Sequence, residues 1–156
     1  MGETTIRLAQ ERDVEQLVEL RRDFTFEDPY PGASRRAGYD DDCRAFLLDA
    51  IAGGRWHIWV AELDGRIVAH AFVALIDRVP RPIQERARLA YLTNVYTRPE
   101  FRGQGIGAQI IRHAQDAARA ADVELMIVWP SEESIEFYER EGFVAPGHAL
   151  VWHAPS

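Results

Sequence analysis

The sequence predicts an α/β protein with a single mixed, largely antiparallel central sheet and helices on both faces. Its 156 residues suit one domain, because domains usually run to about 100–200 residues, and we expect residues 1–156 to form that domain. Apolar residues recur with a period of two in some segments and at helical spacing in others, which separates strands from helices. In chain order the segments are β-α-α-β-β-β-α-β-α-β, which indicates one sheet covered on both sides.

The N-terminal third is predicted to supply one strand and two helices. Thr4–Leu8 alternates as a short strand does, and Glu11–Arg22 carries apolar residues at helical spacing. Phe24–Tyr39 contains proline and glycine without a period, which indicates a loop. Asp40-Asp41-Asp42 then caps a second helix, and Gly53-Gly54 stops it.

The central third has the period of strands. His57–Leu63 and Arg66–Ile76 are joined by Asp64-Gly65, a pair that favours a tight hairpin because such turns need positive φ. A connection rich in proline and arginine, Asp77–Arg86, leads to a further strand at Leu89–Tyr96.

The C-terminal third combines helices and strands. The spacing predicts a helix over Gly105–Ala121, and the apolar run Val123–Trp129 predicts a strand buried on both faces. Ser131–Glu141 is predicted to be a short helix, and Phe143–His153 a last strand or a hairpin. No repeat, low-complexity tract or linker interrupts this order.

Composition and charge exclude several classes of protein. The chain has 18 basic and 25 acidic residues, a net charge of −7, and no basic stripe, so we expect no nucleic-acid partner. All basic residues are arginine, which excludes a Schiff-base lysine and the lysine of a phosphate-binding loop. The five histidines show no metal-ligand spacing, so no metal is expected.

The sequence also indicates a cytoplasmic location. No apolar window is long enough to span a membrane, so no membrane partner is expected. The first residues lack the basic and apolar regions of a signal peptide. The single cysteine, Cys43, cannot form an internal disulfide, which fits a reducing compartment.

A glycine-rich turn follows the strand Leu89–Tyr96 and carries the strongest chemical signal. Gly103, Gly105 and Gly107 let the backbone turn tightly and let a ligand approach without a Cβ in the way. They open a helix whose first turn offers four unpaired N–H groups and about half a positive charge. Arg98 and Arg102 add positive charge beside it. Such a site suits a phosphate group.

The glycine turn has two other interpretations. One is a tight strand-to-helix turn that binds nothing. The other is a Rossmann-type nucleotide binder, because Gly103-x-Gly105-x-x-Ala108 fits the loose dinucleotide fingerprint. The 49 residues after Gly107 are too few for the strands and helices that a dinucleotide fold still needs there.

Two segments resemble the GNAT N-acetyltransferase superfamily. Arg102-Gly103-Gln104-Gly105-Ile106-Gly107, preceded by Val95-Tyr96-Thr97-x-Pro99-Glu100-Phe101, is similar to its acyl-CoA signature. The segment Ser134–Phe143 resembles its aromatic-Tyr-Glu-x-x-Gly-Phe block, and the predicted element order agrees along nearly the whole chain. The resemblance implies a GNAT-like fold in which two parallel strands, Leu89–Tyr96 and Val123–Trp129, splay apart to form the acyl-CoA cleft.

The resemblance also implies where the co-substrate acetyl-CoA binds. The pyrophosphate is expected on the N–H groups of the glycine turn, and the pantetheine arm along the strand before it, by strand addition. Ser131 stands where many members have an asparagine that contacts the cofactor. The residues expected to bind acetyl-CoA are Val95, Tyr96, Thr97, Arg102, Gly103, Gln104, Gly105, Ile106, Gly107, Ala108, Ser131 and Ser134.

The chemistry that the resemblance implies is direct attack of an amine on the thioester in a ternary complex. Tyr138 matches the family tyrosine near the sulfur and is expected to protonate the leaving thiolate. Met126 occupies the position of a glutamate that is the general base in some members, and methionine cannot act as a base. Asn94 with a bound water, Glu124 or a histidine stay open as the base, and Tyr138 and Asn94 are the catalytic candidates.

The sequence therefore predicts an acetyl-CoA-dependent N-acetyltransferase that acts on a small-molecule or peptide amine. The acidic cluster Asp40-Asp41-Asp42 is expected to attract a cationic acceptor. A homodimer is one expected assembly, because a free strand edge in such sheets often pairs. A catalytically degenerate acyl-CoA-binding regulatory domain is the main alternative, since Met126 and Ser131 depart from the family pattern.

Overall fold

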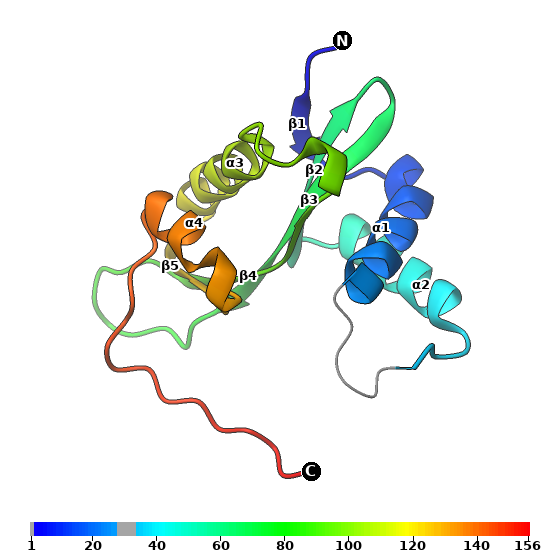
Figure 1. Cartoon of the computed structure of the whole chain (residues 1–156). Coiled ribbons are helices and arrows are strands. Elements are labelled where there is room, and N and C mark those ends of the chain that lie inside the picture. The colour runs from blue at the N-terminus through cyan, green and yellow to red at the C-terminus, as the bar shows by residue number, and fades with distance from the viewer. Residues whose placement is uncertain (1, 28–33) are drawn as a thin grey trace.

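The computed structural model describes residues 2–27 and 34–156, which form a five-stranded sheet with helices on both faces (Figure 1). The strands are β1 (Thr5–Leu8), β2 (Trp56–Leu63), β3 (Arg66–Asp77), β4 (Arg88–Thr97) and β5 (Val123–Val128). They lie side by side in chain order, with β1 to β4 antiparallel and β4 and β5 parallel. The mixed, largely antiparallel sheet that the sequence predicts is confirmed.

Helices cover both faces of the sheet. In the described part of the chain, α1 (Val14–Glu27) and α2 (Tyr39–Ala52) cover one face, and α3 (Ile106–Ala120) and α4 (Ile135–Arg140) cover the other (Figure 1). Short 3-10 turns precede three of these elements; they are η1 (Glu11–Asp13), η2 (Pro99–Phe101) and η3 (Glu132–Ser134). The two helical layers give the sheet two separate apolar cores.

Strand β3 supplies side chains to both cores. Ile67 and Phe72 pack on the α1–α2 side, in a cluster with Leu17, Leu20 and Leu47. Val73 and Leu75 of the same strand pack on the other side, with the apolar stripe of α3. A strand with helices over both faces is expected to be apolar along its length, as β3 is.

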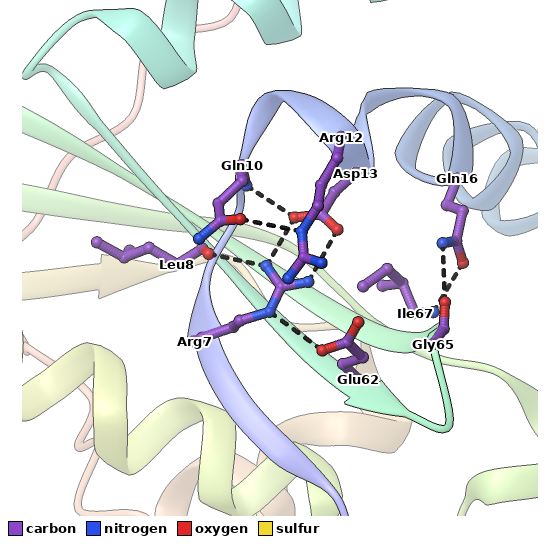
Figure 2. A network of polar contacts seen from close by, with 9 residues as sticks. All are labelled: Arg7, Leu8, Gln10, Arg12, Asp13, Gln16, Glu62, Gly65 and Ile67. Carbon is purple, nitrogen blue, oxygen red and sulfur yellow. Dashed lines mark hydrogen bonds and ion pairs between the residues drawn. The ribbon is translucent and has the colours of Figure 1, made fainter.

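A polar network holds the entry of α1 against the sheet (Figure 2). The two terminal nitrogens of Arg7 donate to the carboxylate of Asp13 at 2.7 and 2.9 Å, and its Nε donates to Glu62 at 3.3 Å. The backbone N–H of Gln10 donates to the same carboxylate at 2.7 Å. Burial raises the pKa of Asp13, but the hydrogen bonds from Arg7 and Gln10 together outweigh burial and hold this pKa below its ordinary value.

The side chain of Gln16 ties α1 to the hairpin between β2 and β3. Its Oε1 accepts the backbone N–H of Ile67 at 2.8 Å, and its Nε2 donates to the carbonyl of Gly65 at 3.3 Å (Figure 2). The position of α1 over β3 is thereby set at its N-terminal end. The same helix carries Asp23 and Glu27 toward the end of β4, where the candidate site lies.

The first helix is longer than the sequence predicts. It continues past Arg22 to Glu27, so the predicted loop Phe24–Tyr39 begins about one turn later. Phe24 explains the extension, because its ring stacks on Tyr96 of β4 with centroids 4.8 Å apart. Residues 28–33 of that loop lie outside the described residues.

The prediction that Val123–Trp129 is a strand buried on both faces is wrong. β5 is the edge strand of the sheet, and Glu124 and Leu125 are exposed. The predicted last strand or hairpin over Phe143–His153 does not form, and Leu150 is 99% exposed. Pro146 lacks a backbone donor and Gly147 has a φ of +74°, so this segment is interrupted where a strand would need continuous pairing.

Candidate active site

β4 contains a β-bulge in the middle of the sheet. Between the pairs His70–Tyr96 and Phe72–Thr93, two residues of β4, Asn94–Val95, lie opposite one residue of β3. Asn94 has a φ of +53°, in the left-handed region, which asparagine tolerates better than most residues other than glycine. A bulge of this kind bends its strand and changes the direction of its backbone groups.

Beyond the bulge, β4 and β5 separate. Their parallel register runs from Arg88–Val123 to Leu92–Val128, whereas β4 continues to Thr97. The segment Thr93–Thr97 therefore has no β5 partner. Apart from the Thr97 carbonyl, which accepts from Arg102, its backbone groups on that edge are available to pair with an extended ligand. The splayed parallel strands that the sequence predicts are confirmed.

The glycine turn has the backbone geometry of an anion site. Gly103 and Gly105 have φ values of +75° and +81°, which only glycine adopts without strain. Gly105 is the N-cap of α3, and the first hydrogen bond within the helix runs from the N–H of Gln109 to its carbonyl, at 3.1 Å. The N–H groups of Gly105–Ala108 thus have no helical acceptor, and no acidic side chain lies in this first turn.

Three of the predicted segments meet at Gly107. A Cβ placed on this glycine would lie 3.4 Å from Cζ of Phe137 and 3.7 Å from Oγ1 of Thr97. The end of β4, the first turn of α3 and the helix α4 are therefore neighbours. Because Gly107 has no side chain, Phe137 packs directly against the start of α3.

Tyr138, the predicted acid, lies on α4 inside the core that faces α3. It is 7% exposed, and its ring packs edge-on to Phe137 and Phe143 at centroid distances of 5.0 and 5.5 Å. Burial raises the pKa of Tyr138 to about 12. The phenol is therefore protonated at neutral pH, as a proton donor to a thiolate must be.

Ser131 and Ser134 bond to each other in the turn before α4. Their Oγ atoms are 3.0 Å apart, and the Ser134 hydroxyl also donates to the Ser131 carbonyl at 3.0 Å. Ser131 is exposed and Ser134 is half-buried. Their hydrogen bonds hold the η3 turn that leads into α4.

The side chains of Tyr96 and Arg102 face α1. The Tyr96 hydroxyl donates to Glu27 at 3.3 Å, and the Arg102 guanidinium lies 5.4 Å from the Tyr96 ring centroid. Arg102 donates to the Thr97 carbonyl at 2.9 Å and to Glu27 at 2.7 Å. The Tyr96 ring is thus held against α1, and Tyr96 itself stays in register with His70 of β3.

Arg98 does not add charge to the glycine turn as the sequence predicts. It is 8% exposed, and its Nε donates to the carbonyl of Ile67 at 3.2 Å. Its terminal nitrogens pair with Asp23 at 3.4 Å and Glu19 at 3.9 Å. The carboxylates of α1 thus neutralise Arg98, and sequence spacing alone does not reveal these distant partners.

Two cavities lie on the α1–α2 side of the sheet in the described part of the chain, and one of them reaches the end of β4. One, of about 440 Å³, is lined by α1, by the start of α2 and by residues 34–36. The other, of about 420 Å³, is lined by Tyr96, Arg98 and the end of α1. They share Arg22, Phe26 and Arg35, and their size suits a small-molecule ligand.

The acidic cluster at the start of α2 is neutralised by arginines. Asp40 pairs with Arg22 at 2.7 Å, Asp41 pairs with Arg44 at 2.9 Å, and Asp42 pairs with Arg36 at 2.6 Å. Each carboxylate therefore has a cationic partner in the structure. This arrangement weakens the prediction that the cluster attracts a cationic acceptor.

The candidates for the general base differ in position. Glu124 is exposed, pairs with Arg78 and lies near the start of β5, at the opposite end of the β4–β5 pair from the splay. His70 is fully buried, and burial is the main reason that its pKa falls to about 4. Asn94 lies on the bulge, with its side-chain amide 3.3 Å from the Thr93 hydroxyl. Of Glu124, His70 and Asn94, only Asn94 combines a place at the splay with partial exposure.

The part of the chain that the structure describes holds neither a metal cluster nor a membrane-spanning helix. Within residues 2–27 and 34–156, no group of three or more His, Cys, Asp or Glu side chains is placed to hold a metal ion. No helix in the same ranges has both the length and the apolar character needed to cross a membrane.

Comparison with known proteins shows the family. Residues 54–145 match the acetyltransferase (GNAT) domain. An uncharacterized N-acetyltransferase of Methanocaldococcus jannaschii is 33% identical over 88 residues, which are 54% of this chain and only 38% of that protein. Glucosamine 6-phosphate N-acetyltransferase of Trypanosoma brucei brucei is 25% identical over 140 residues, 90% of this chain and 88% of the relative.

A solved structure shows the same fold. A predicted acetyltransferase from Clostridium acetobutylicum, crystallised with acetyl-CoA, superposes with a TM-score of 0.80 at 24% identity, over 97% of this chain and 96% of that one. Because the match to the GNAT domain spans residues 54–145, more than half of the chain, the chain belongs to the GNAT acetyltransferase family. It is an acyltransferase of that family, as the resemblance of the two motifs implies.

Proposed function

We propose that the protein transfers the acetyl group of acetyl-CoA to an amine by direct attack in a ternary complex, and that residues 1–156 form one catalytic domain. One observation carries the proposal. The unpaired end of β4 and the free N–H groups of Gly105–Ala108 lie next to each other, joined at Gly107. An elongated ligand with amides at one end and a pyrophosphate at the other fits this pair of sites.

Backbone groups are the principal binding groups in this proposal. The N–H groups of the first turn of α3 bind the pyrophosphate, helped by the positive end of the helix dipole. The free edge of Val95–Thr97 pairs with the amides of the pantetheine arm, as an added strand would. Gln104 and Ser131, which are exposed, and Ser134, which is half-buried, are proposed as further contacts around this path.

Three groups of the chain are proposed to assist the chemistry. A backbone N–H at the bulge, near Val95, stabilises the negative charge that develops on the thioester oxygen. The Tyr138 hydroxyl protonates the thiolate as the carbon–sulfur bond breaks and the carbon–nitrogen bond forms. Asn94 holds a water that receives the proton of the attacking amine. These roles use only groups at the end of β4 and on α4.

A small-molecule amine is the proposed acceptor class. The cavity of about 420 Å³ beside Tyr96 and the neighbouring cavity of about 440 Å³ suit a ligand of that size. Arg22 and Arg35 line both cavities, and arginine recognises carboxylate and phosphate well. An acceptor panel should therefore include amines with and without an anionic group, among them glucosamine 6-phosphate, which the trypanosomal relative is named for.

The test combines binding with turnover. Release of free thiol from acetyl-CoA is followed with the amine panel, and thermal stabilisation is compared for acetyl-CoA and NAD. Amine-dependent thiol release and stabilisation by acetyl-CoA support the proposal. Binding of acetyl-CoA with no amine-dependent release would instead support a degenerate acyl-CoA-binding regulatory domain, and stabilisation by NAD alone would support a nucleotide binder.

We also propose a homodimer in which a second copy covers the free edge of β5. Leu125 and Trp129 are 46% and 61% exposed there, and Leu150 and Trp152 of the C-terminal segment are 99% and 81% exposed. The apolar C-terminal segment of one copy can therefore pack on the open β5 edge of the other copy. Light scattering should give twice the monomer mass, and Leu150→Glu should reduce it to the monomer mass. A wild-type protein that is monomeric at all concentrations would refute the dimer.

A further inference from the structure

His70 is the most deeply buried titratable side chain that the proposed chemistry does not use. It lies on β3, is 1% exposed, and sits beside the β4 bulge. Its ring packs edge-to-face on Phe72, with ring centroids 5.3 Å apart, and lies beside the Tyr96 ring, with centroids 5.9 Å apart. A histidine in this position needs a physical reason, because leucine or phenylalanine would fill the same space without polar atoms.

The hydrogen bond of His70 defines its tautomer. Nδ1 lies 2.7 Å from the carbonyl oxygen of Asn94, and a carbonyl can only accept, so Nδ1 carries the proton. The ring is neutral, because burial lowers its pKa to about 4. Nε2 then has an unshared pair and no partner in the described structure. Nδ1 thus makes the one hydrogen bond that the described structure gives this ring, to the carbonyl of Asn94, while Nε2 is buried without a partner.

The acceptor of this bond is the bulged residue itself. The bulge interrupts regular pairing between β3 and β4 at Asn94, which also has a φ of +53°. A side-chain donor on β3 therefore satisfies the Asn94 carbonyl where the regular ladder is broken. The same planar peptide group contributes the N–H of Val95, the group proposed to face the thioester oxygen.

We propose that His70 is a positioning residue for the reaction: its Nδ1–H holds the Asn94 carbonyl and so fixes the direction of the bulge backbone that meets the acyl donor. This inference rests on the proposed function. His70 itself touches no reacting atom, because it is sealed beneath Tyr96 and Phe72. It acts on the site only through the Asn94 carbonyl and the β4 bulge.

Two variants of nearly equal shape separate positioning from packing. In His70→Asn the side-chain amide places a donor close to where Nδ1 was, whereas His70→Leu has the same branching and no donor. Both remove the ring, so both lose its packing on Phe72 and Tyr96. A difference between them therefore reports on the hydrogen bond.

The first measurement is independent of catalysis. Amide hydrogen exchange at Asn94–Tyr96 is followed by NMR in the ligand-free protein. We expect exchange in His70→Leu to be at least tenfold faster than in wild type, and His70→Asn to stay within about threefold of wild type. Equal exchange in the two variants would overturn the proposal, even if the protein turned out to have no acetyltransferase activity.

The second measurement is steady-state kinetics together with acetyl-CoA affinity. We expect kcat of His70→Leu to fall at least tenfold below that of His70→Asn, with melting temperatures of the two variants close together. Equal kcat values, with lower stability in both, would make His70 a packing residue only. If wild type releases no thiol with any amine, the proposed function fails while the exchange experiment still decides whether His70 holds the bulge.

Discussion

Replacing Tyr138 by phenylalanine removes one hydroxyl and keeps the ring packed between Phe137 and Phe143. Burial is the one cause of the raised pKa of Tyr138, so no charged or hydrogen-bonding partner in the described structure holds its hydroxyl. Losing the hydroxyl therefore leaves no orphaned partner, and the free energy of unfolding should change by less than about 0.5 kcal/mol. For a chain of this size that corresponds to less than about 2 °C in Tm.

The effect on catalysis should be far larger. A positioned acid contributes about 10²–10⁴ to the rate, so kcat and kcat/KM should fall together by that factor, equivalent to about 2.7–5.5 kcal/mol of transition-state stabilisation. The Kd for acetyl-CoA should change little, because the proposed binding contacts are on β4 and the glycine turn. Since the pKa of Tyr138 is about 12, the wild-type rate should not decline through its ionisation between pH 7 and 10.

The assay is thiol release at saturating acetyl-CoA and amine, paired with calorimetric titration of acetyl-CoA. Tyr91→Phe is the matched control, because Tyr91 lies on β4 where that strand still pairs with β5. A Tyr138→Phe enzyme within threefold of wild type would show that water or the thiolate itself manages the proton. A variant that loses acetyl-CoA affinity would make Tyr138 a binding residue, and the acid would have to be sought elsewhere.

Three further predictions test the glycine turn, the polar network and the acidic cluster. Gly105→Val should abolish acetyl-CoA binding in titration. The control is Gly38→Val, at another N-cap with φ of +76° and open space around it, which should cost similar stability and leave the acetyl-CoA affinity unchanged. Equal loss of affinity in both variants would refute the assignment of the turn. Asp13→Asn should lower the free energy of unfolding by about 2–3 kcal/mol near pH 7, seen as a Tm lower by about 4–12 °C. Because the folded-state pKa of Asp13 is depressed, wild type should lose this advantage as the pH falls below about 4, and a constant difference down to pH 2 would contradict the argument. Since Asp40–Asp42 are paired with arginines, kcat/KM should change less than about threefold between 0.1 and 1 M salt, and a steep fall would restore electrostatic steering of a cationic acceptor.

The sequence by itself determined the features that depend on residues near one another in the chain. Gly103 and Gly105 were identified as turn residues because only glycine adopts their positive φ without strain, and the structure shows those angles. The amphipathic stripe of α3 and the hairpin at Asp64-Gly65 were found for the same reason, since their signals lie within a few residues. The two motifs that resemble the GNAT superfamily were likewise local, and the family is confirmed.

Only the tertiary structure decided which distant groups meet. Arg98 pairs with carboxylates of α1 and not with the glycine turn, and Asp40–Asp42 pair with arginines. Charged side chains pair with the opposite charges that the fold places near them. β5 is the edge strand of the sheet, and the predicted last strand or hairpin over Phe143–His153, which contains Pro146 and Gly147, does not form. The bulge at Asn94–Val95 is a two-against-one pairing with β3, and its support comes from His70 on that other strand. No pattern within β4 alone specifies such a contact, because it depends on the register between strands that are separated in the sequence.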